Sequence, residues 1–173
     1  MLLALASAAL LSLAPSRACG QQPIPGEPLL RSHALKPRAP VKMFVPSGTV
    51  RIFGWDREAI EIRGRLPAAA QLSLTGTDSG VKLIVDEPSG KPAASSKLSI
   101  YMPRRSQVSL KTVDATVDAT DIGGWFYTVS GSLRIGGSMS SVEAEAMSGD
   151  ITLAAATPWA RARTGAGHLI VTG

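Results

Sequence analysis

Three residues of this chain, Ser132, Asp150 and His168, carry the side chains of a hydrolytic triad. In such a triad the imidazole lies between the hydroxyl and the carboxylate, so that it takes the hydroxyl proton while the carboxylate orients it. The serine and the aspartate are 18 residues apart, and so are the aspartate and the histidine. Equal spacing is typical of a structural repeat. The order in which the repeat stacks these residues therefore decides whether they can react.

Glycines mark the repeat that must position these side chains. Gly131, Gly149 and Gly167 each precede one member of the set and share the 18-residue spacing. Short stretches of alternating apolar and polar residues lie between them, which is the pattern of half-buried strands. We therefore predict an all-β fold, a parallel β-solenoid (β-helix-like) with two-strand rungs of about 18 residues, preceded by less regular β-strands.

The stacking order argues against a triad. It places Asp150 between Ser132 and His168, so the serine lies two strands, or about 10 Å, from the imidazole. We expect Asp150 to accept a hydrogen bond from His168 as a structural contact, and we expect nothing to activate Ser132. The sequence predicts no catalytic residues.

The sequence lacks the residue patterns of phosphate-binding and metal sites. The chain has no phosphate-binding loop and no zinc-ligand spacing, and the other histidine, His33, has no second ligand nearby. A calcium-binding repeat would need an acidic residue in every copy, and Asp150 has no acidic counterpart at positions 132 and 168. We predict no metal site and no cofactor.

Outward side chains of the repeat fall into two adjacent columns, each with an aromatic residue, a glutamate and an arginine. The columns are Trp125, Glu143, Arg161 and Tyr127, Glu145, Arg163. Opposite charges one strand apart contribute about 0.2–1 kcal/mol per pair. Two interpretations stay open: the charges fix the register of the strands, or the aromatic residues beside them form a flat interaction surface for a sugar or a protein partner.

Inward side chains differ in size between the two faces of the predicted solenoid. One face carries mainly large residues and the other mainly small ones, which predicts a thin, flattened core. The first set is Val117, Ala119, Leu133, Ile135, Ile151, Leu153, Leu169 and Val171, and the second is Phe126, Thr128, Ala144, Ala146, Ala162 and Thr164.

The N-terminus predicts export. Residues 1–20 contain an apolar run too short to span a bilayer, followed by small residues, as in a signal peptide, although no positively charged segment precedes the run. Cys19 is the only cysteine, so no intramolecular disulfide can form. We expect a protein of the periplasm or cell surface; soluble export and lipidation at Cys19, the one route to a membrane, both stay open.

The rest of the chain divides by its patterning. We predict a Pro-rich tether at residues 21–40, an irregular β-strand region at 41–111 and regular solenoid rungs at 112–173. The 18 Lys and Arg exceed the 13 Asp and Glu, giving a net charge of +5, but they are scattered among acids along the sequence. A nucleic-acid partner is therefore not expected.

Several motifs resemble the bacterial putative-adhesin, β-strand-repeat family of unknown function. They are Gly54-Trp55-Asp56-Arg57-Glu58, Ile60-Glu61-Ile62-Arg63-Gly64, Tyr101-Met102-Pro103, Thr112-Val113-Asp114 and the Ser-Gly-Asp-Ile type repeats, over Val41 to Gly173. The resemblance implies an exported β-helix-like envelope protein, with no catalytic residues to transfer. Members of the family commonly continue for more repeats, so we expect an incomplete reading frame here. An open strand edge favours edge-to-edge self-association.

These observations predict a noncatalytic exported cell-envelope protein with an adhesin-like role in surface or partner interaction and in envelope structure. Its partner would be an envelope protein or a glycan. Two alternatives stay open. One is an enzyme that acts on envelope or extracellular polysaccharide on a β-helix scaffold, and the other is an accessory protein to an envelope-stress sensor.

Overall fold

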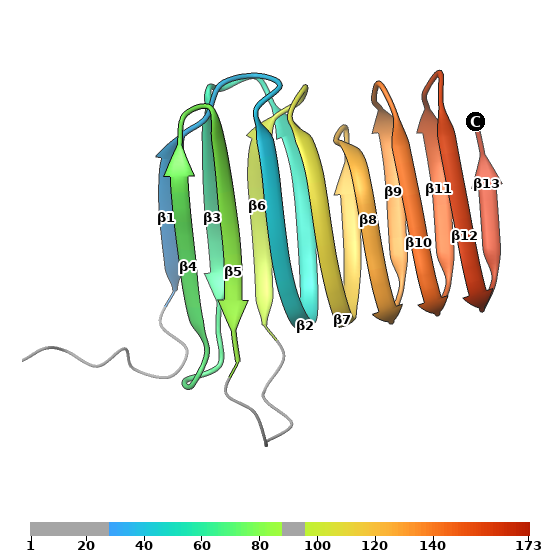
Figure 1. Cartoon of the computed structure of the whole chain (residues 1–173), viewed down its shortest axis with the longest axis horizontal. Helices are drawn as coiled ribbons and strands as arrows, with labels where there is room; N and C mark the ends of the chain where they lie inside the picture. The colour runs from blue at the N-terminus through green and yellow to red at the C-terminus, as the bar shows by residue number, and fades with distance from the viewer. Residues whose placement is uncertain (1–27, 88–95) are drawn as a thin grey trace, which may run out of the picture.

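The computed structural model describes residues 28–87 and 96–173, and all regular elements in these residues are strands (Figure 1). The 13 strands form one mixed sheet, which confirms the all-β prediction. The predicted signal peptide, Cys19 and the first part of the predicted tether lie outside the described residues. No described helix is long and apolar enough to cross a membrane.

The strands are numbered in chain order. They are β1 (Leu29–Ala34), β2 (Pro40–Trp55), β3 (Ala59–Arg65), β4 (Gln71–Thr77), β5 (Gly80–Asp86), β6 (Lys97–Pro103), β7 (Gln107–Thr120), β8 (Gly123–Ser130), β9 (Leu133–Ser138), β10 (Val142–Ser148), β11 (Ile151–Ala156), β12 (Ala160–Ala166) and β13 (Leu169–Thr172).

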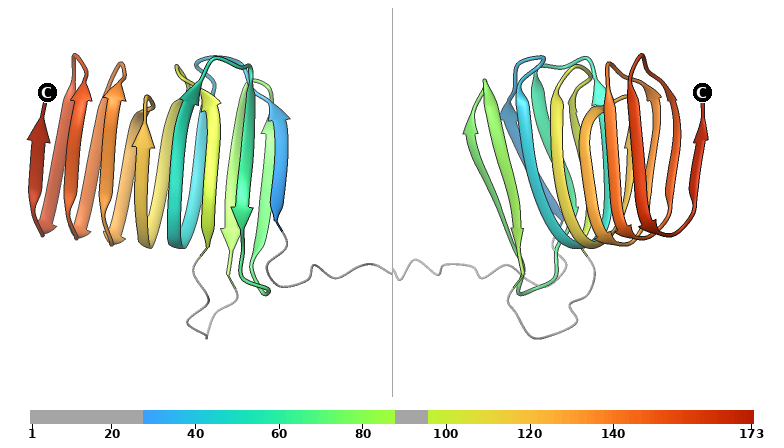
Figure 2. Two further views of the ribbon diagram at one scale, coloured as in Figure 1. Left: turned by 180° about the vertical axis from the view of Figure 1, so that it is seen from behind. Right: turned by 45° about the vertical axis from the view of Figure 1, so that its right-hand side comes forward.

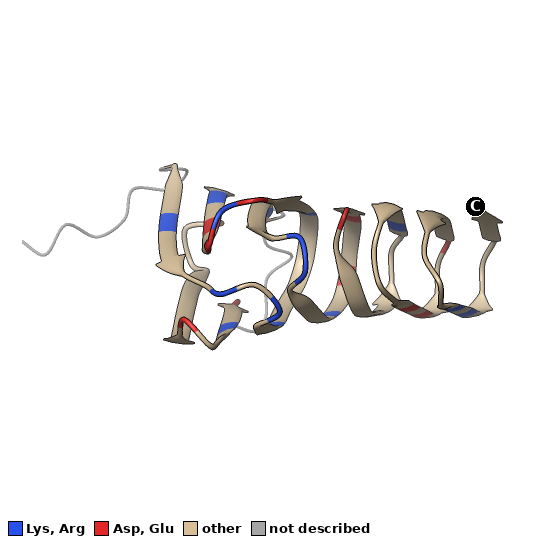
Figure 3. Ribbon diagram, turned by 90° about the horizontal axis from the view of Figure 1, so that it is seen from above, with Lys and Arg blue, Asp and Glu red and all other residues tan. Residues whose placement is uncertain are grey.

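The strands lie in two layers (Figure 3), and two long strands, β2 and β7, pass from one layer to the other. The first half of each belongs to the front layer, in the order β4-β5-β2-β7-β8-β10-β12, which is the near row in Figure 1. The second half of each belongs to the back layer, in the order β1-β3-β6-β2-β7-β9-β11-β13, which faces the viewer in the left view of Figure 2. Strands of either layer can therefore bury one face against the other layer.

The core lies between the layers because the strands alternate in burial. In β2, for example, Val41 and Met43 are buried in the front layer, and Val50 and Ile52 are buried in the back layer. Most inward positions of the repeat are confirmed: Val117, Ala119, Leu133, Ile135, Ile151, Leu153, Phe126, Thr128, Ala144 and Ala146 are buried, and Ala162 and Thr164 are half-buried.

Two inward predictions are wrong. Leu169 and Val171 of β13 are 44% and 57% exposed, respectively. β13 pairs with β11 alone among the described strands, so its side chains have a neighbour on one side only.

The regular spacing of the sequence appears as strand pairing. β8, β10 and β12 pair in parallel, with Trp125 beside Glu143 and Glu143 beside Arg161. β9, β11 and β13 pair in parallel with the same offset. One step earlier the offset is shorter, because Gln107 of β7 pairs with Gly123 of β8, and Ser109 pairs with Trp125.

Backbone conformation and close packing explain why glycine recurs at the turns of the repeat. Gly149 has a φ of 145°, a conformation that residues with a Cβ rarely adopt. A Cβ on Gly149 would lie 1.9 Å from the carbonyl oxygen of Gly131, and one on Gly167 would lie 2.2 Å from that of Gly149. Each turn therefore lies directly on the backbone of the turn before it, which only glycine permits.

Residues 29–34 form a strand where we predicted part of a Pro-rich tether. β1 pairs antiparallel with β3, and Leu35, which follows it, is 1% exposed. The tether prediction is wrong here because Pro28 and Pro37 lie outside β1 and leave its backbone free to pair. His33 is half-buried in β1 rather than solvated, and its Nε2 atom has no hydrogen-bond partner among the described residues. The remaining domain boundaries stay predictions.

Candidate functional site

Asp150 lies between the turns that carry Ser132 and His168, as the repeat predicted. The backbone N–H of Leu133, next to Ser132, donates to the carbonyl of Asp150 at 2.9 Å, and that of Ile151 donates to the carbonyl of His168 at 2.9 Å. No hydrogen bond joins Ser132 to His168 within residues 28–87 and 96–173. The imidazole therefore does not stand between hydroxyl and carboxylate, which is the arrangement a triad needs.

Asp150 and His168 make the structural contact that the sequence predicted. The backbone N–H of His168 donates to Asp150 Oδ1 at 2.8 Å, and His168 Nδ1 lies 3.2 Å from the same oxygen. These contacts, the backbone hydrogen bond first, hold the pKa of the Asp150 carboxyl below its ordinary value. The ionised carboxylate thus links the turn at Asp150 to the turn at His168.

The front layer carries the two outward columns in the predicted arrangement. Cross-strand pairing places Glu143 beside Trp125 and Arg161, and Glu145 beside Tyr127 and Arg163. We call this surface the ladder face; it comprises Trp125, Tyr127, Glu143, Glu145, Arg161 and Arg163.

Ion pairs link β10 to β12 on the ladder face. The Nη1 atom of Arg161 lies 3.1 Å from Glu143 Oε1, and that of Arg163 lies 3.7 Å from Glu145 Oε1. Both arginines are more than half exposed, so water and salt screen the attraction.

We expect a double-mutant cycle on Glu143→Gln and Arg161→Gln to give a coupling free energy of about 0.2–1 kcal/mol. The coupling should shrink when the salt concentration of the urea titration is raised from low to about 1 M, where the screening length falls to about 3 Å. A coupling near zero at low salt would show that this pair does not fix the register.

The aromatic part of the ladder face is half-buried by its neighbours. The rings of Trp125 and Tyr127 stack with centroids 5.7 Å apart and an interplanar angle of 22°. Beside them a hollow of about 340 Å³ is lined by Tyr127, Met147 and Arg163, among others. The stacked rings and this hollow give the ladder face a shaped apolar part between charged side chains.

Lys111 belongs beside this surface, and our reading of the sequence missed it. Its Nζ atom lies 5.3 Å from the centroid of the Trp125 ring, within the range of a cation–π contact. β7 pairs with β8 so that Lys111 lies beside Tyr127. Extending the period of the glycines backwards from Tyr127 leads to Ser109 instead, because the step between β7 and β8 is shorter. The alternation of residues 108–111 is the signal that marks Lys111 as outward.

A second aromatic group, on the back layer, was also missed. The ring of Tyr101 on β6 stacks on Phe53 and Trp55 of β2, with centroids 5.2 Å and 5.4 Å apart. Trp55 Nε1 donates to the carbonyl of Ala59 at 2.9 Å, which fixes its ring. These strands lie outside the regular repeat, so no period could pair them. The outward alternation of Phe53 and Trp55 was the available signal.

Among the described residues, no group of three His, Cys, Asp or Glu side chains is placed to hold a metal ion.

No protein-family model matches the chain, and no curated protein matches it. Solved structures do. One is a putative cell adhesion protein from Clostridium sporogenes, 10% identical, which covers 84% of this chain and 99% of its own, with a TM-score of 0.48.

Two others are putative adhesins. The one from Bacteroides fragilis is 13% identical over 85% of this chain and 97% of its own, with a TM-score of 0.38. The one from Parabacteroides distasonis is 12% identical over 80% of this chain and 79% of its own, with a TM-score of 0.30. All three structures are thus described as putative adhesins or a putative cell adhesion protein.

Proposed function

We propose that this protein is a noncatalytic, exported cell-envelope protein, a β-solenoid whose ladder face binds an envelope glycan or protein. The observation that carries the proposal is the ladder face itself: two stacked rings, flanked by Lys111 and by the Glu143 and Glu145 ion pairs, beside a hollow. Parallel pairing that repeats with the same offset in both layers supports the solenoid. The predicted signal peptide at residues 1–20 supports export to the periplasm or cell surface.

The chemistry of the ladder face suits a glycan. Aromatic rings offer rigid apolar area at a low entropic cost, and the neighbouring charged groups can donate to or accept from sugar hydroxyls. The position of Asp150 between Ser132 and His168 supports the absence of catalysis, since a serine without a nearby base is a weak nucleophile.

We expect the double variant Trp125→Ser/Tyr127→Ser to lose at least tenfold in affinity for immobilised envelope preparations, because it removes both rings and leaves the charges. Binding is measured by surface plasmon resonance, and folding by circular dichroism. Trp159→Ser is the matched control: this ring is 51% exposed but lies outside the ladder face. Unchanged binding by the double variant, with native circular dichroism, would contradict the proposed surface.

The enzyme alternative has a direct test. Purified protein is incubated with envelope polysaccharide, and the products are assayed for new reducing ends and for unsaturated sugars. We expect neither. The noncatalytic proposal would be overturned if the parent protein formed either product and a variant with one polar residue substituted no longer formed it.

The sensor alternative and the anchoring at Cys19 are tested in cells. The protein is used to capture binding partners from membranes. Enrichment of one membrane protein, by the parent protein and equally by the Trp125→Ser/Tyr127→Ser variant, would favour an accessory role over glycan binding. The mass of the mature N-terminus decides between soluble export and lipidation at Cys19.

A further inference from the structure

The back layer gathers basic side chains where β3, β6 and β2 lie side by side. β3 pairs antiparallel with β6, and β6 pairs parallel with β2, so outward residues of the three strands form rows. One row is Arg65, Lys97, Thr49, and the next is Arg63, Ser99, Arg51. Six adjacent positions thus hold four cationic side chains and two hydroxyls, and no acid.

Three of these four cations have no ion-pair partner among the described residues. Arg63 forms an ion pair with Glu61, but Arg51, Arg65 and Lys97 form none within residues 28–87 and 96–173. Asp118 lies opposite Arg51 in β7, yet it pairs with Arg134 at 3.9 Å.

The pairing of β3 with β6 sets Arg65 directly beside Lys97, and like charges in that position destabilise a sheet. A bound anion would relieve this repulsion.

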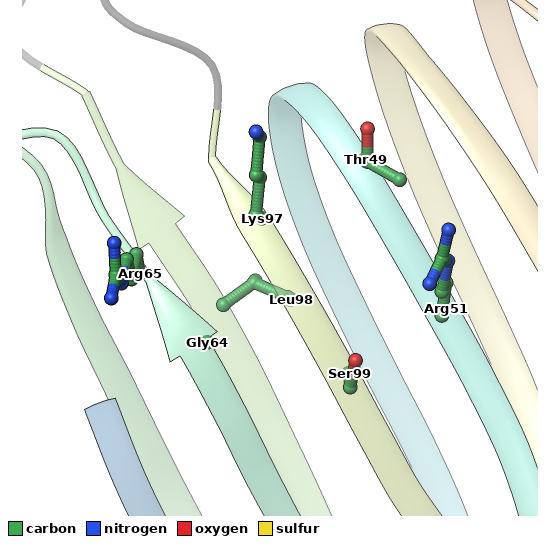
Figure 4. Close-up of a pocket in the computed structure, with 7 residues that line it drawn as sticks. All are labelled: Thr49, Arg51, Gly64, Arg65, Lys97, Leu98 and Ser99. Carbon is green, nitrogen blue, oxygen red and sulfur yellow. The ribbon is translucent and has the colours of Figure 1, made fainter. Parts of the chain in front are cut away.

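Five of these six residues, all except Arg63, line a hollow of about 450 Å³ together with Gly64 and Leu98 (Figure 4). Arg65, Lys97 and Arg51 rise around it from β3, β6 and β2, and the hydroxyls of Thr49 and Ser99 lie between the charges. This volume is in the range of about 300–1,000 Å³ that is typical of small-ligand sites. We call it the basic hollow.

Aromatic side chains border the basic hollow. The next row of the same three strands is Glu61, Tyr101, Phe53, and the rings of Tyr101 and Phe53 are stacked 5.2 Å apart. A sugar that carries an anionic group could place this group among the cations and hydroxyls. Its sugar ring could then contact the rings of Tyr101 and Phe53.

From this arrangement we infer that the basic hollow binds the phosphate groups of a phosphorylated glycan. An arginine fork matches the oxygens of a phosphate with two parallel hydrogen bonds, and a lysine adds a compact charge. Thr49 and Ser99 donate to further oxygens, and the Tyr101 and Phe53 rings contact the attached sugar. The inference goes beyond the proposed function because the basic hollow lies on the opposite layer and contains no residue of the ladder face.

The test compares two variants that lose the same charge. Arg51→Gln/Arg65→Gln/Lys97→Gln empties the basic hollow of its unpaired cations. Lys42→Gln/Lys82→Gln/Arg105→Gln removes three exposed cations elsewhere. Binding of the full chain to phosphomannan is measured by isothermal titration calorimetry, with dextran as the uncharged polymer. We expect the first variant to lose at least tenfold in affinity, the second less than twofold, and dextran not to bind.

Equal losses in the two variants would mean unspecific attraction to a basic protein and would overturn the inference. Vesicles of phosphatidylglycerol separate a lipid phosphate from a glycan phosphate: binding to vesicles that exceeds binding to phosphomannan, and that the first variant abolishes, would assign the basic hollow to a lipid headgroup instead. Binding of phosphomannan depends on different residues from the envelope binding tested at Trp125 and Tyr127, so each result stands by itself.

A footprint on the unchanged protein covers the case in which the triple variant does not fold. Amines are acetylated with and without phosphomannan, and the modified lysines are identified by mass spectrometry. We expect phosphomannan to slow the acetylation of Lys97 at least fivefold and to leave that of Lys42 unchanged. Equal rates at Lys97 with and without the polymer would refute the basic hollow as its site.

Discussion

Gly149→Ala is expected to lower the free energy of unfolding by about 2–5 kcal/mol. Two costs add. The φ of 145° is strained for alanine, at about 1–3 kcal/mol, and the new Cβ would lie 1.9 Å from the carbonyl oxygen of Gly131, which forces the two turns apart. These two turns resist separation because the N–H of Leu133, which follows the first turn, donates to the carbonyl of Asp150 in the second at 2.9 Å. Urea unfolding followed by circular dichroism measures the loss.

Gly136→Ala is the matched control. Gly136 lies in β9, it is not among the glycines with positive φ, and the nearest atom to an added Cβ is the carbonyl oxygen of Ala154 at 3.3 Å. We expect a change below about 1 kcal/mol, typical of a glycine whose conformation alanine can adopt. If both variants unfolded at the same urea concentration, the close contact between the turns would not be what selects glycine at position 149.

The spacing of these glycines also explains why part of the candidate site could be predicted. A strict period fixes which residues are neighbours before any partner strand is known, so Glu143 could be set beside Arg161, and Asp150 beside His168, by counting one period along the chain. The same count placed Asp150 in the middle of the apparent triad. For this part of the chain the sequence determines strand register as well as strand positions.

The period fails where the turns change length. Gln107 of β7 pairs with Gly123 of β8, a shorter step than the period, so Lys111, which lies against Trp125, fell outside the predicted columns. A shorter turn shifts every outward side chain along the column relative to the next strand. Alternation alone identifies Lys111 as outward, but it cannot say which residue of the next strand lies beside it.

Outside the repeat, the partners of each strand depend on contacts between distant residues. The sequence does not reveal that Lys97 lies between Arg65 and Thr49. β6 pairs with β3 and β2 because this pairing buries its inward face. We judged the basic residues to be scattered, and along the sequence they are. The topology nevertheless brings residues 49–51, 63–65 and 97–99 into one patch. An even distribution of charge in sequence therefore does not exclude a charged surface in the fold.

Ala144→Leu is expected to cost about 1–3 kcal/mol, because it forces a larger side chain into a filled core. Ala144 is fully buried in β10 between Phe126 of β8 and half-buried Ala162 of β12. Small residues recur on this face of the repeat, which leaves room for the larger side chains of the other layer.

Ala154→Leu, at an exposed position of β11, is the control, and we expect it to change stability by less than about 0.5 kcal/mol. Thermal melts of both variants beside the parent protein measure the difference. If the Ala144→Leu variant had the same melting temperature as the parent protein, the core between the two layers would have room for a leucine at this position. The alternation of small and large inward residues would then reflect something other than the distance between the layers.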